Sequence, residues 1–344
     1  MTIHRPAAIP RSLTRRAAVG AGVLAIAAIT ACGSGSGSAG GSGDVKLALT
    51  AYSTPAEAYK ELIPAFQETP AGKGVRFTES YGASGAQSRA VIAGLPTDIV
   101  ALSLAPDVDK LVKPGLVASD WTEDQYKGFV TDSVVVLVVR KGNPKGIKTW
   151  DDLLKPGVQV VTPNPFTSGG AKWNVLGAYG AQLKQGKTEA QAADYLRSLF
   201  KNVVSQDKSA REALQTFAAG KGDVLLSYEN EAITAQEKDQ DVDYVIPDQT
   251  ILIQNPIAVT TTSKHPEQAE GFVDFLRTEP AQKIFAKHGY RPVLRSALDP
   301  TAYPTPPGLF TIDDVGGWDA VNKEIFATDG LLGEIEESLG VTTG

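Results

Sequence analysis

Apolar and polar residues alternate from residue 45 onward in a pattern that predicts a mixed α/β protein. Short runs rich in β-branched residues, such as VKLALTAY at 45–52 and SVVVLVV at 133–139, are typical of buried strands, and the longer segments between them read as helices. The predicted strands are 45–52, 75–80, 98–104, 133–139, 158–162, 203–206, 223–227 and 251–260, and the predicted helices are 55–66, 85–93, 150–154, 169–184, 189–201, 211–219 and 266–278. This alternation predicts mostly parallel α/β layers.

The first 31 residues have the pattern of a signal peptide. Four arginines and no acidic residue precede an apolar run of about 13 residues, 17–29, which is short for a membrane span. The run ends at Ile29-Thr30-Ala31-Cys32, which resembles a bacterial lipoprotein signal. We therefore predict that Cys32, the only cysteine, is a lipid anchor rather than a small buried residue. The pair Arg15-Arg16 leaves open whether export follows the twin-arginine route.

A tether that begins with this cysteine is predicted over residues 32–43. Positions 33–43 hold only Gly, Ser and one Ala, a flexible composition with a root-mean-square reach of roughly 18 Å. Removing residues 1–31 leaves 29 basic and 39 acidic residues, a net charge of −10. The expected product is an acidic, membrane-anchored lipoprotein outside the cytoplasm.

Composition excludes several classes of function. One Cys and three His are too few for the attachment pair of a haem or for an iron-sulfur cluster, and a zinc site of Cys and His ligands would use nearly all of them, so we expect no metal or cofactor. The net charge of −6 argues against a nucleic-acid partner, because phosphate binding needs a basic face. An anion ligand would have to be held by something other than bulk positive charge.

Enzyme motifs are also missing from the sequence. Gly82-Ala83-Ser84-Gly85 is not the Gly-x-Ser-x-Gly elbow of a hydrolase, and Gly220-Lys221-Gly222 lacks the spacing and the Ser or Thr of a Walker A loop. We predict that the chain is not an enzyme.

Helix starts after strands are the most informative local feature. Capping boxes are predicted at Thr54–Glu57, Ser84–Gln87 and Ser209–Glu212, and 164–170 starts a long helix with two glycines that allow close approach to the backbone. In open α/β sheets the carboxyl ends of strands form the ligand edge, and helix N-termini offer free N–H donors with partial positive charge. Several such termini would form an anion site without a cationic side chain.

Six segments resemble the prokaryotic sulfate-binding proteins of ABC transporters. They are SYGASGAQSRAVI at 80–92, VVRKGNPK at 138–145, TPNPFTSGGAKWN at 162–174, GDVLLSYENEA at 222–232, YRP at 290–292 and LFTIDDV at 309–315. The resemblance covers nearly all of the chain after the tether, and the block at 162–174 is the most specific.

The resemblance implies a two-lobe α/β fold of the periplasmic-binding-protein kind, type II topology, with the ligand in the cleft between the lobes. Lobe I would comprise residues 44–131 and 251–300, lobe II residues 132–250, and residues 301–344 a C-terminal helical segment packed on both. The implied partners are sulfate and a membrane permease with a separate ATPase subunit, and the protein is expected to be a monomer. Thiosulfate, molybdate or phosphate as the main ligand, or a surface lipoprotein without a transport role, are the alternatives.

Ligand donors follow from the resemblance position by position. The implied donors are Ser53, Thr54, Ser84, Ser168 through its hydroxyl, Gly169, Gly170, Ala210 and Tyr228. Two positions depart from the family: a Tyr-Asp dipeptide is here Tyr52-Ser53, and an indole donor is replaced by Tyr228. A backbone donor survives the first change, whereas Tyr228 has to offer a hydroxyl from a different place or leave the role to water.

Charged and aromatic residues near these positions are expected to play supporting parts. Arg89 and Arg211, in first helical turns, are predicted to lie behind the direct ligand donors and to pair with acids. Glu229 and Glu231 should already be satisfied, and Trp173 should pack in a core. His265 and His288 read as solvated surface residues.

Overall fold

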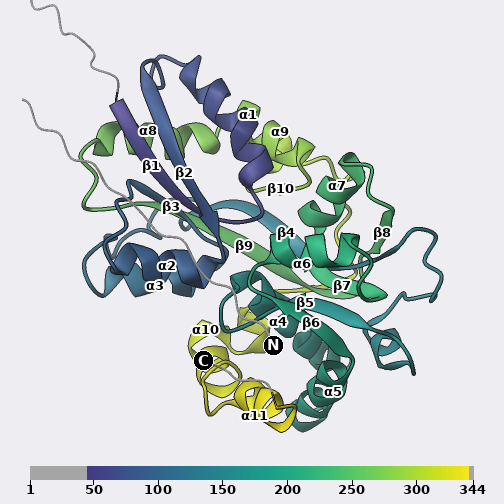
Figure 1. The fold of residues 1–344 in the computed structure, drawn as a ribbon. Helices are drawn as coiled ribbons and strands as arrows, with labels where there is room; N and C mark the ends of the chain where they lie inside the picture. Colours follow the sequence, from purple (N-terminus) through teal and green to yellow (C-terminus); the bar gives the residue numbers. More distant parts are fainter. Residues whose placement is uncertain (1–44, 341–344) are drawn as a thin grey trace, which may run out of the picture. The chain divides into compact units, whose positions relative to one another are not determined.

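In the computed structural model, which describes residues 45–340, strands and helices alternate along most of the chain (Figure 1). The strands are β1 Val45–Tyr52, β2 Val75–Gly82, β3 Ile99–Ala101, β4 Phe129–Arg140, β5 Val160–Pro163, β6 Val203–Asp207, β7 Val224–Tyr228, β8 Val242–Val245, β9 Gln249–Val259, β10 Arg291–Pro292 and β11 Gly308–Phe310. The α-helices are α1 Ala56–Gln67, α2 Ser84–Ile92, α3 Ala105–Val112, α4 Gly169–Lys184, α5 Glu189–Lys201, α6 Ala210–Ala218, α7 Glu229–Glu237, α8 Pro266–Leu276, α9 Glu279–Lys287, α10 Gly317–Glu324 and α11 Leu331–Ser338. Three short 3₁₀ helices are η1 Trp150–Leu154, η2 Arg295–Ala297 and η3 Asp313–Val315.

Two long strands, β4 and β9, connect two groups of strands. The sheet order is β2-β1-β3-β9-β4-β7-β5-β6. We call β1, β2 and β3 the first strand group, β5 to β8 the second strand group, and β4 and β9 the crossing strands. The end of β9 pairs with β3, the start of β4 pairs with β9, and the rest of β4 pairs with β7 and β8.

The sheet is mixed, so the prediction of mostly parallel layers was wrong. Pairing is parallel within each group, as in β1 with β2 and β3, and β5 with β6 and β7. The crossing strands run antiparallel to every strand beside them except β11. Apolar content predicts that a strand is buried but does not encode its direction, which depends on the distant segments that pair with it.

Helices cover both faces of each strand group. On the first group, α1, α8 and α9 bury a cluster that includes Leu47, Phe66 and Phe272, while α2 and α3 bury Val100 and Leu111 on the other face. The aromatic rings of Phe66 and Phe272 lie 5.0 Å apart, edge to face. These two cores fix the ends of β1, β2 and β3, from which the loops toward α1, α2 and α3 emerge.

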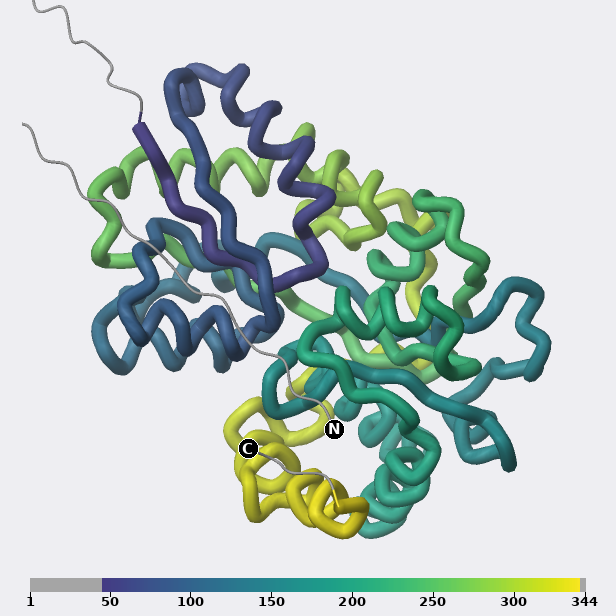
Figure 2. The backbone as a smooth tube through the Cα atoms, in the orientation of Figure 1, coloured from purple at the N-terminus to yellow at the C-terminus, as the bar shows by residue number. Residues whose placement is uncertain are grey.

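On the second group, α6 and α7 cover one face, with Phe217 at the centre of their cluster. The other face is covered by α4, α5 and the C-terminal elements, whose shared core includes Trp150, Leu176 and Phe310. In Figure 2 the yellow C-terminal segment returns to lie beside α5, in agreement with the contacts between α11 and α5. The C-terminal helices therefore pack on α4 and α5 of the second strand group.

Most predicted elements are present, and the differences are local. The sequence missed α3, α7, α9, β8, β10 and β11, the strand predicted at 98–104 is limited to Ile99–Ala101, and 150–154 is a 3₁₀ helix. The predicted lobe boundaries at 131/132 and 250/251 fall inside the crossing strands and stay predictions. The predicted signal peptide, Cys32 and the tether lie outside the described residues. Within 45–340, no helix combines the length and apolarity needed to cross a membrane.

Candidate functional site

A small cavity lies where the helices of the two strand groups begin. The centre of a water-sized sphere can occupy only about 10 Å³ of it, which is room for one small molecule or ion. Its lining residues are Tyr52, Ser53, Thr54, Gly82, Ala83, Ser84, Ser103, Ser168, Gly170, Ala210 and Tyr228. The lining contains neither an acidic nor a basic side chain, and its size suits a small ion rather than a sugar or a peptide.

Four helix N-termini contribute to this lining. Ser53 and Thr54 precede α1, Ser84 begins α2, Gly170 is in the first turn of α4, and Ala210 begins α6. The first N–H groups of a helix have no intrahelical acceptor and carry part of the positive end of the helix dipole. Several such ends at one cavity create a local positive field in an acidic protein.

Two of the three predicted capping boxes are absent from the structure. Pro55 caps α1 and Ala83 caps α2, neither with a side-chain bond, so the boxes predicted from Thr54 and Ser84 were wrong. Both hydroxyls bond elsewhere, because tertiary partners are available: Thr54 Oγ1 lies 2.9 Å from the Tyr290 hydroxyl, and Ser84 Oγ donates to Asp107 Oδ2 at 2.7 Å. Ser84 therefore has its backbone N–H, not its hydroxyl proton, to offer a ligand.

Ser168 and Ser209 are both side-chain caps, of which the sequence predicted the second. Ser168 Oγ accepts from Ala171 N at 3.4 Å, and Ser209 Oγ accepts from Glu212 N at 3.2 Å. Both serines are buried, but only Ser168 lines the cavity. The hydroxyl proton of Ser168 has no acceptor among residues 45–340, so it is free for a ligand.

Ser103, just after β3, joins the two strand groups at the cavity. Its Oγ lies 2.6 Å from the Tyr228 hydroxyl, and its carbonyl accepts from Trp173 Nε1 at 2.9 Å. A methyl group on Gly169 would lie 2.7 Å from Ser103 Oγ and 2.6 Å from Leu104 Cδ2. The glycine is therefore required for α4 to approach this loop, and the structure is a closed arrangement of the two groups.

Buried tyrosines surround the inner end of the cavity. The Tyr52 hydroxyl is buried and makes no hydrogen bond to the described residues. Burial raises the pKa of Tyr52, against the lowering effect of the nearby Tyr290 and Thr54 hydroxyls. Burial also holds the pKa of Tyr228 well above its usual value, so its phenol keeps its proton.

Acidic residues next to the cavity are neutralised by arginines. Arg291 binds Glu229 with Nε 2.7 Å from Oε2, and Arg211 Nη2 lies 2.7 Å from Glu231 Oε1, so both glutamates are satisfied as predicted. Burial lowers the pKa of Arg211, but the charge and hydrogen bonds of Glu231, together with Tyr290 and Glu57, outweigh burial, so the pKa is raised. Burial raises the pKa of Glu229, against the effect of Arg291.

The two arginines predicted to lie behind the ligand donors have different surroundings. Arg211 Nη2 also donates to the Thr54 carbonyl at 3.0 Å, so it connects α6 to the loop before α1. Arg89 is exposed in the last turn of α2, so its predicted place in a first turn was wrong, and neither arginine lines the cavity. Lys172, in the next turn of α4, bonds Asn322 Oδ1 at 3.0 Å, and burial lowers its pKa to about 8, with a further lowering by Lys110.

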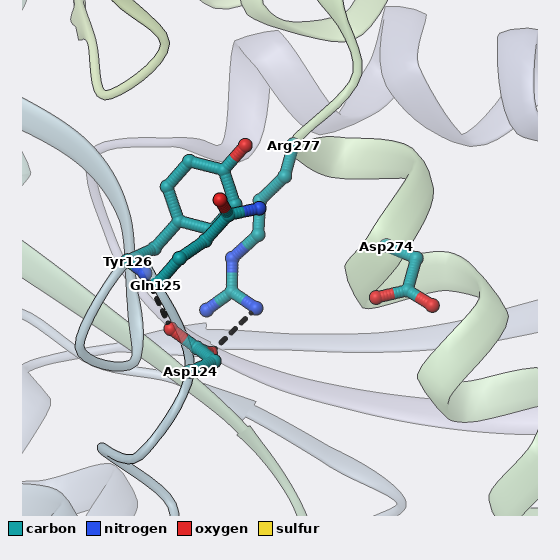
Figure 3. A pocket seen from close by; sticks show the side chains of 5 residues that line it. All are labelled: Asp124, Gln125, Tyr126, Asp274 and Arg277. Carbon is teal, nitrogen blue, oxygen red and sulfur yellow. Dashed lines mark hydrogen bonds and ion pairs between the residues drawn. The ribbon is translucent and has the colours of Figure 1, made fainter.

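Another hollow lies on the loop before β4. Figure 3 shows Asp124 bridged to Arg277, with Asp274 opposite. The Asp124 and Asp274 carboxylates would repel an anion, and the only lining cation, Arg277, is paired at 2.8 Å. We therefore assign the anion-site features to the small cavity and not to this hollow.

The structure brings seven of the eight predicted donors into the lining of one cavity, and Gly169 lies beside it. Sequence reasoning missed Tyr52, Gly82, Ala83 and Ser103 as lining residues. Ser103 carries no local motif, although a serine at the carboxyl end of a predicted strand was a usable signal. Trp173 is buried, as predicted, whereas the prediction for His288 was wrong: its Nε2 lies 3.1 Å from Glu61 Oε2 and its side chain is only 15% exposed. Residues 45–340 contain no cluster of three or more His, Cys, Asp or Glu side chains able to hold a metal ion.

Comparison with known proteins identifies a family. Residues 47–291 match the model of the bacterial extracellular solute-binding proteins. A sulfate-binding protein of Synechococcus elongatus is 45% identical, over 95% of this chain and 98% of its own length. That of Escherichia coli is 38% identical over 86% and 94%, and a thiosulfate-binding protein of Pseudomonas aeruginosa is 36% identical over 83% and 90%.

A solved structure agrees with these relatives. The sulfate-binding protein SubI of Mycobacterium tuberculosis superposes with a TM-score of 0.80 at 44% sequence identity, covering 82% of this chain and all of that one. The expectation of a two-lobe periplasmic-binding-protein fold is confirmed by this match.

Proposed function

The chain belongs to the bacterial extracellular solute-binding proteins, and we propose that it captures sulfate in the small cavity and delivers it to an ABC permease with a separate ATPase subunit. One observation carries the proposal: a cavity without charged side chains, at which four helix N-termini and several hydroxyls meet. The similarity to sulfate-binding proteins over nearly the whole chain supports the same ligand.

Hydrogen-bond donors alone can hold a dianion with useful affinity. Each bond to a charged group contributes about 1.5 to 3 kcal/mol net, so six or seven offset the desolvation of sulfate and leave about −8 kcal/mol, in the micromolar range. We infer that Ser84, Gly169, Gly170 and Ala210 donate backbone N–H groups and that Ser168 donates its hydroxyl proton. Ser53 and Thr54 are further backbone donors under this proposal.

Selectivity would follow from the absence of a free carboxylate in the lining. A protonated phosphate carries a donor that needs an acceptor, and it loses affinity where none is placed for it. Glu229 and Glu231, the acids nearest in sequence to Tyr228, are already bound by Arg291 and Arg211. Arg211 would act on the ligand indirectly, because it joins α6 to the carbonyl of Thr54. Arg89 would act through the positive charge that it places on α2.

Calorimetric titration of the purified protein with sulfate, thiosulfate, molybdate and phosphate tests this function. We expect micromolar binding of sulfate and much weaker binding of phosphate at pH 7. Emission of Trp173, which bonds Ser103 across the two strand groups, should change on sulfate addition. Trp173→Phe should lose that change, while Trp150→Phe, at another buried indole, should keep it. No response to sulfate or thiosulfate at millimolar concentration would refute the proposal.

Thiosulfate is the second candidate ligand, because a thiosulfate-binding relative is 36% identical and both dianions present similar acceptor oxygens. The ratio of the two affinities in the same titration decides between them.

We further propose that the mature protein is a monomer held outside the cytoplasm by lipid on Cys32, with residues 33–43 as its tether. Cys32→Ser should release the protein from the membrane fraction without changing its sulfate affinity. Retention of this variant in the membrane fraction would contradict the lipid anchor. The mass of the released protein, measured by light scattering, tests whether it is a monomer.

A further inference from the structure

Two hydroxyl groups from different strand groups meet at the cavity. Ser103 lies two residues after β3, Tyr228 ends β7, and their oxygens are 2.6 Å apart. Both residues line the cavity and both are 1% exposed. A bond between two hydroxyls uses one of the two protons, so this pair keeps one proton for a ligand.

The chemistry of the two groups indicates which proton is left. A phenol is a stronger acid than an aliphatic alcohol, and it is therefore the better donor, while the alcohol oxygen is the better acceptor. On this ground Tyr228 donates to Ser103 Oγ, which leaves the Ser103 proton without an acceptor among the described residues.

Ser103 is held on several sides. Its N–H donates to Ser84 Oγ at 3.0 Å, and its carbonyl accepts from Trp173 Nε1 at 2.9 Å and from Asn255 Nδ2 at 3.0 Å. Gly169 packs directly against its side chain. A hydroxyl fixed in this way is preorganised, which makes a hydrogen bond to a ligand stronger in effect.

Building on the proposed function, we propose that Ser103 donates its hydroxyl proton to the bound anion and that Tyr228 is a positioning residue that acts through it. The side-chain donor that the sequence assigned to Tyr228 is then supplied by Ser103, from the opposite strand group. Cooperative polarisation strengthens the Ser103 donor, because Tyr228 donates to the same oxygen.

A double-mutant cycle with sulfate calorimetry tests this assignment. We expect Ser103→Ala to weaken sulfate binding about 10- to 100-fold, mainly through faster dissociation, because a bond to a charged ligand is lost. Tyr228→Phe keeps the Ser103 hydroxyl and should cost less than about fivefold. The double variant should bind no more weakly than Ser103→Ala, since Tyr228 acts only through Ser103.

The matched control is Ser227→Ala. Ser227 precedes Tyr228 on β7, is equally buried, does not line the cavity, and its hydroxyl has no partner among residues 45–340. This variant should bind sulfate like the parent protein. Thermal unfolding checks that every variant is folded, and Ser103→Gly, which lacks the same hydroxyl, replaces Ser103→Ala if that variant is not.

Failure of the two proposals gives different results. If the parent protein does not bind sulfate, the proposed function fails. If the parent binds and Ser103→Ala changes affinity less than about twofold, the Ser103 assignment is overturned. A larger loss in Tyr228→Phe than in Ser103→Ala, or losses that multiply in the double variant, would also overturn it.

Discussion

Replacing Ser168 with alanine separates ligand donation from helix capping at the start of α4. The Ser168 hydroxyl accepts one weak bond, from Ala171 N at 3.4 Å, and its proton is free for a ligand. Loss of the cap should lower the free energy of unfolding by about 0.5 to 1 kcal/mol, the low end for caps because the bond is long. Loss of a bond to a dianion should cost about 1.5 to 3 kcal/mol of binding, or about 13- to 160-fold in affinity.

Ser209→Ala is the matched control, because Ser209 caps α6 but does not line the cavity. Its cap bond is 3.2 Å long, so this variant should lose at least as much stability as Ser168→Ala while its sulfate affinity changes less than about threefold. Calorimetry gives the affinities and urea denaturation gives the stabilities. If the two variants bind sulfate equally well and both remain folded, the Ser168 hydroxyl is not a ligand donor.

Three further changes test the closed arrangement, the buried ion pair and the pH response. Gly169→Ala places a methyl group 2.7 Å from Ser103 Oγ, so calorimetry should show sulfate affinity at least about tenfold weaker; an unchanged affinity would mean that closure needs no glycine there. Glu229→Ala leaves Arg291 buried without its partner and should cost about 3 to 5 kcal/mol in urea denaturation, whereas a loss below about 1 kcal/mol would contradict the pairing. Burial raises the pKa of Asp132 from 3.8 to about 7, against the effect of Arg291, so the folded chain binds this proton more tightly than the unfolded chain. The free energy of unfolding should therefore fall as the pH rises from about 4 to about 7, and Asp132→Asn should reduce that fall; equal pH profiles of the two proteins would contradict this role of Asp132.

The sequence predicted most of the elements because their signals are local. Apolar runs such as β1 and helix starts such as Ser168 depend on a few neighbouring residues. The direction of β9 could not be predicted in the same way, since it depends on partners far along the chain. Helix α7 was missed because its apolar pattern is interrupted by Glu229 and Glu231, which are buried only because Arg291 and Arg211 reach them.

The backbone donors of the candidate site could be predicted from the sequence, whereas the hydrogen bonds of its hydroxyl groups could not. Glycines and helix starts mark Gly169, Gly170 and Ala210 directly in the sequence. A hydroxyl, by contrast, bonds to whichever group the fold brings near, as Ser84 does with Asp107. Ser103 acquires its neighbours only when β3 and α4 come together, so its place at the end of a predicted strand could mark it as a candidate but could not show its contacts.

The crossing strands also determine the order in which the protein can assemble. The first strand group lacks a neighbour for β3 until Ile257–Val259 is available, and Thr260 Oγ1 bonds the Thr97 carbonyl across 163 residues of sequence. A chain that emerges from its N-terminus therefore exposes an unfinished sheet edge for most of its length, the kind of edge that invites aggregation. Folding of this protein should start late and depend on protection of the emerging chain, and fragments that end before β9 should not fold.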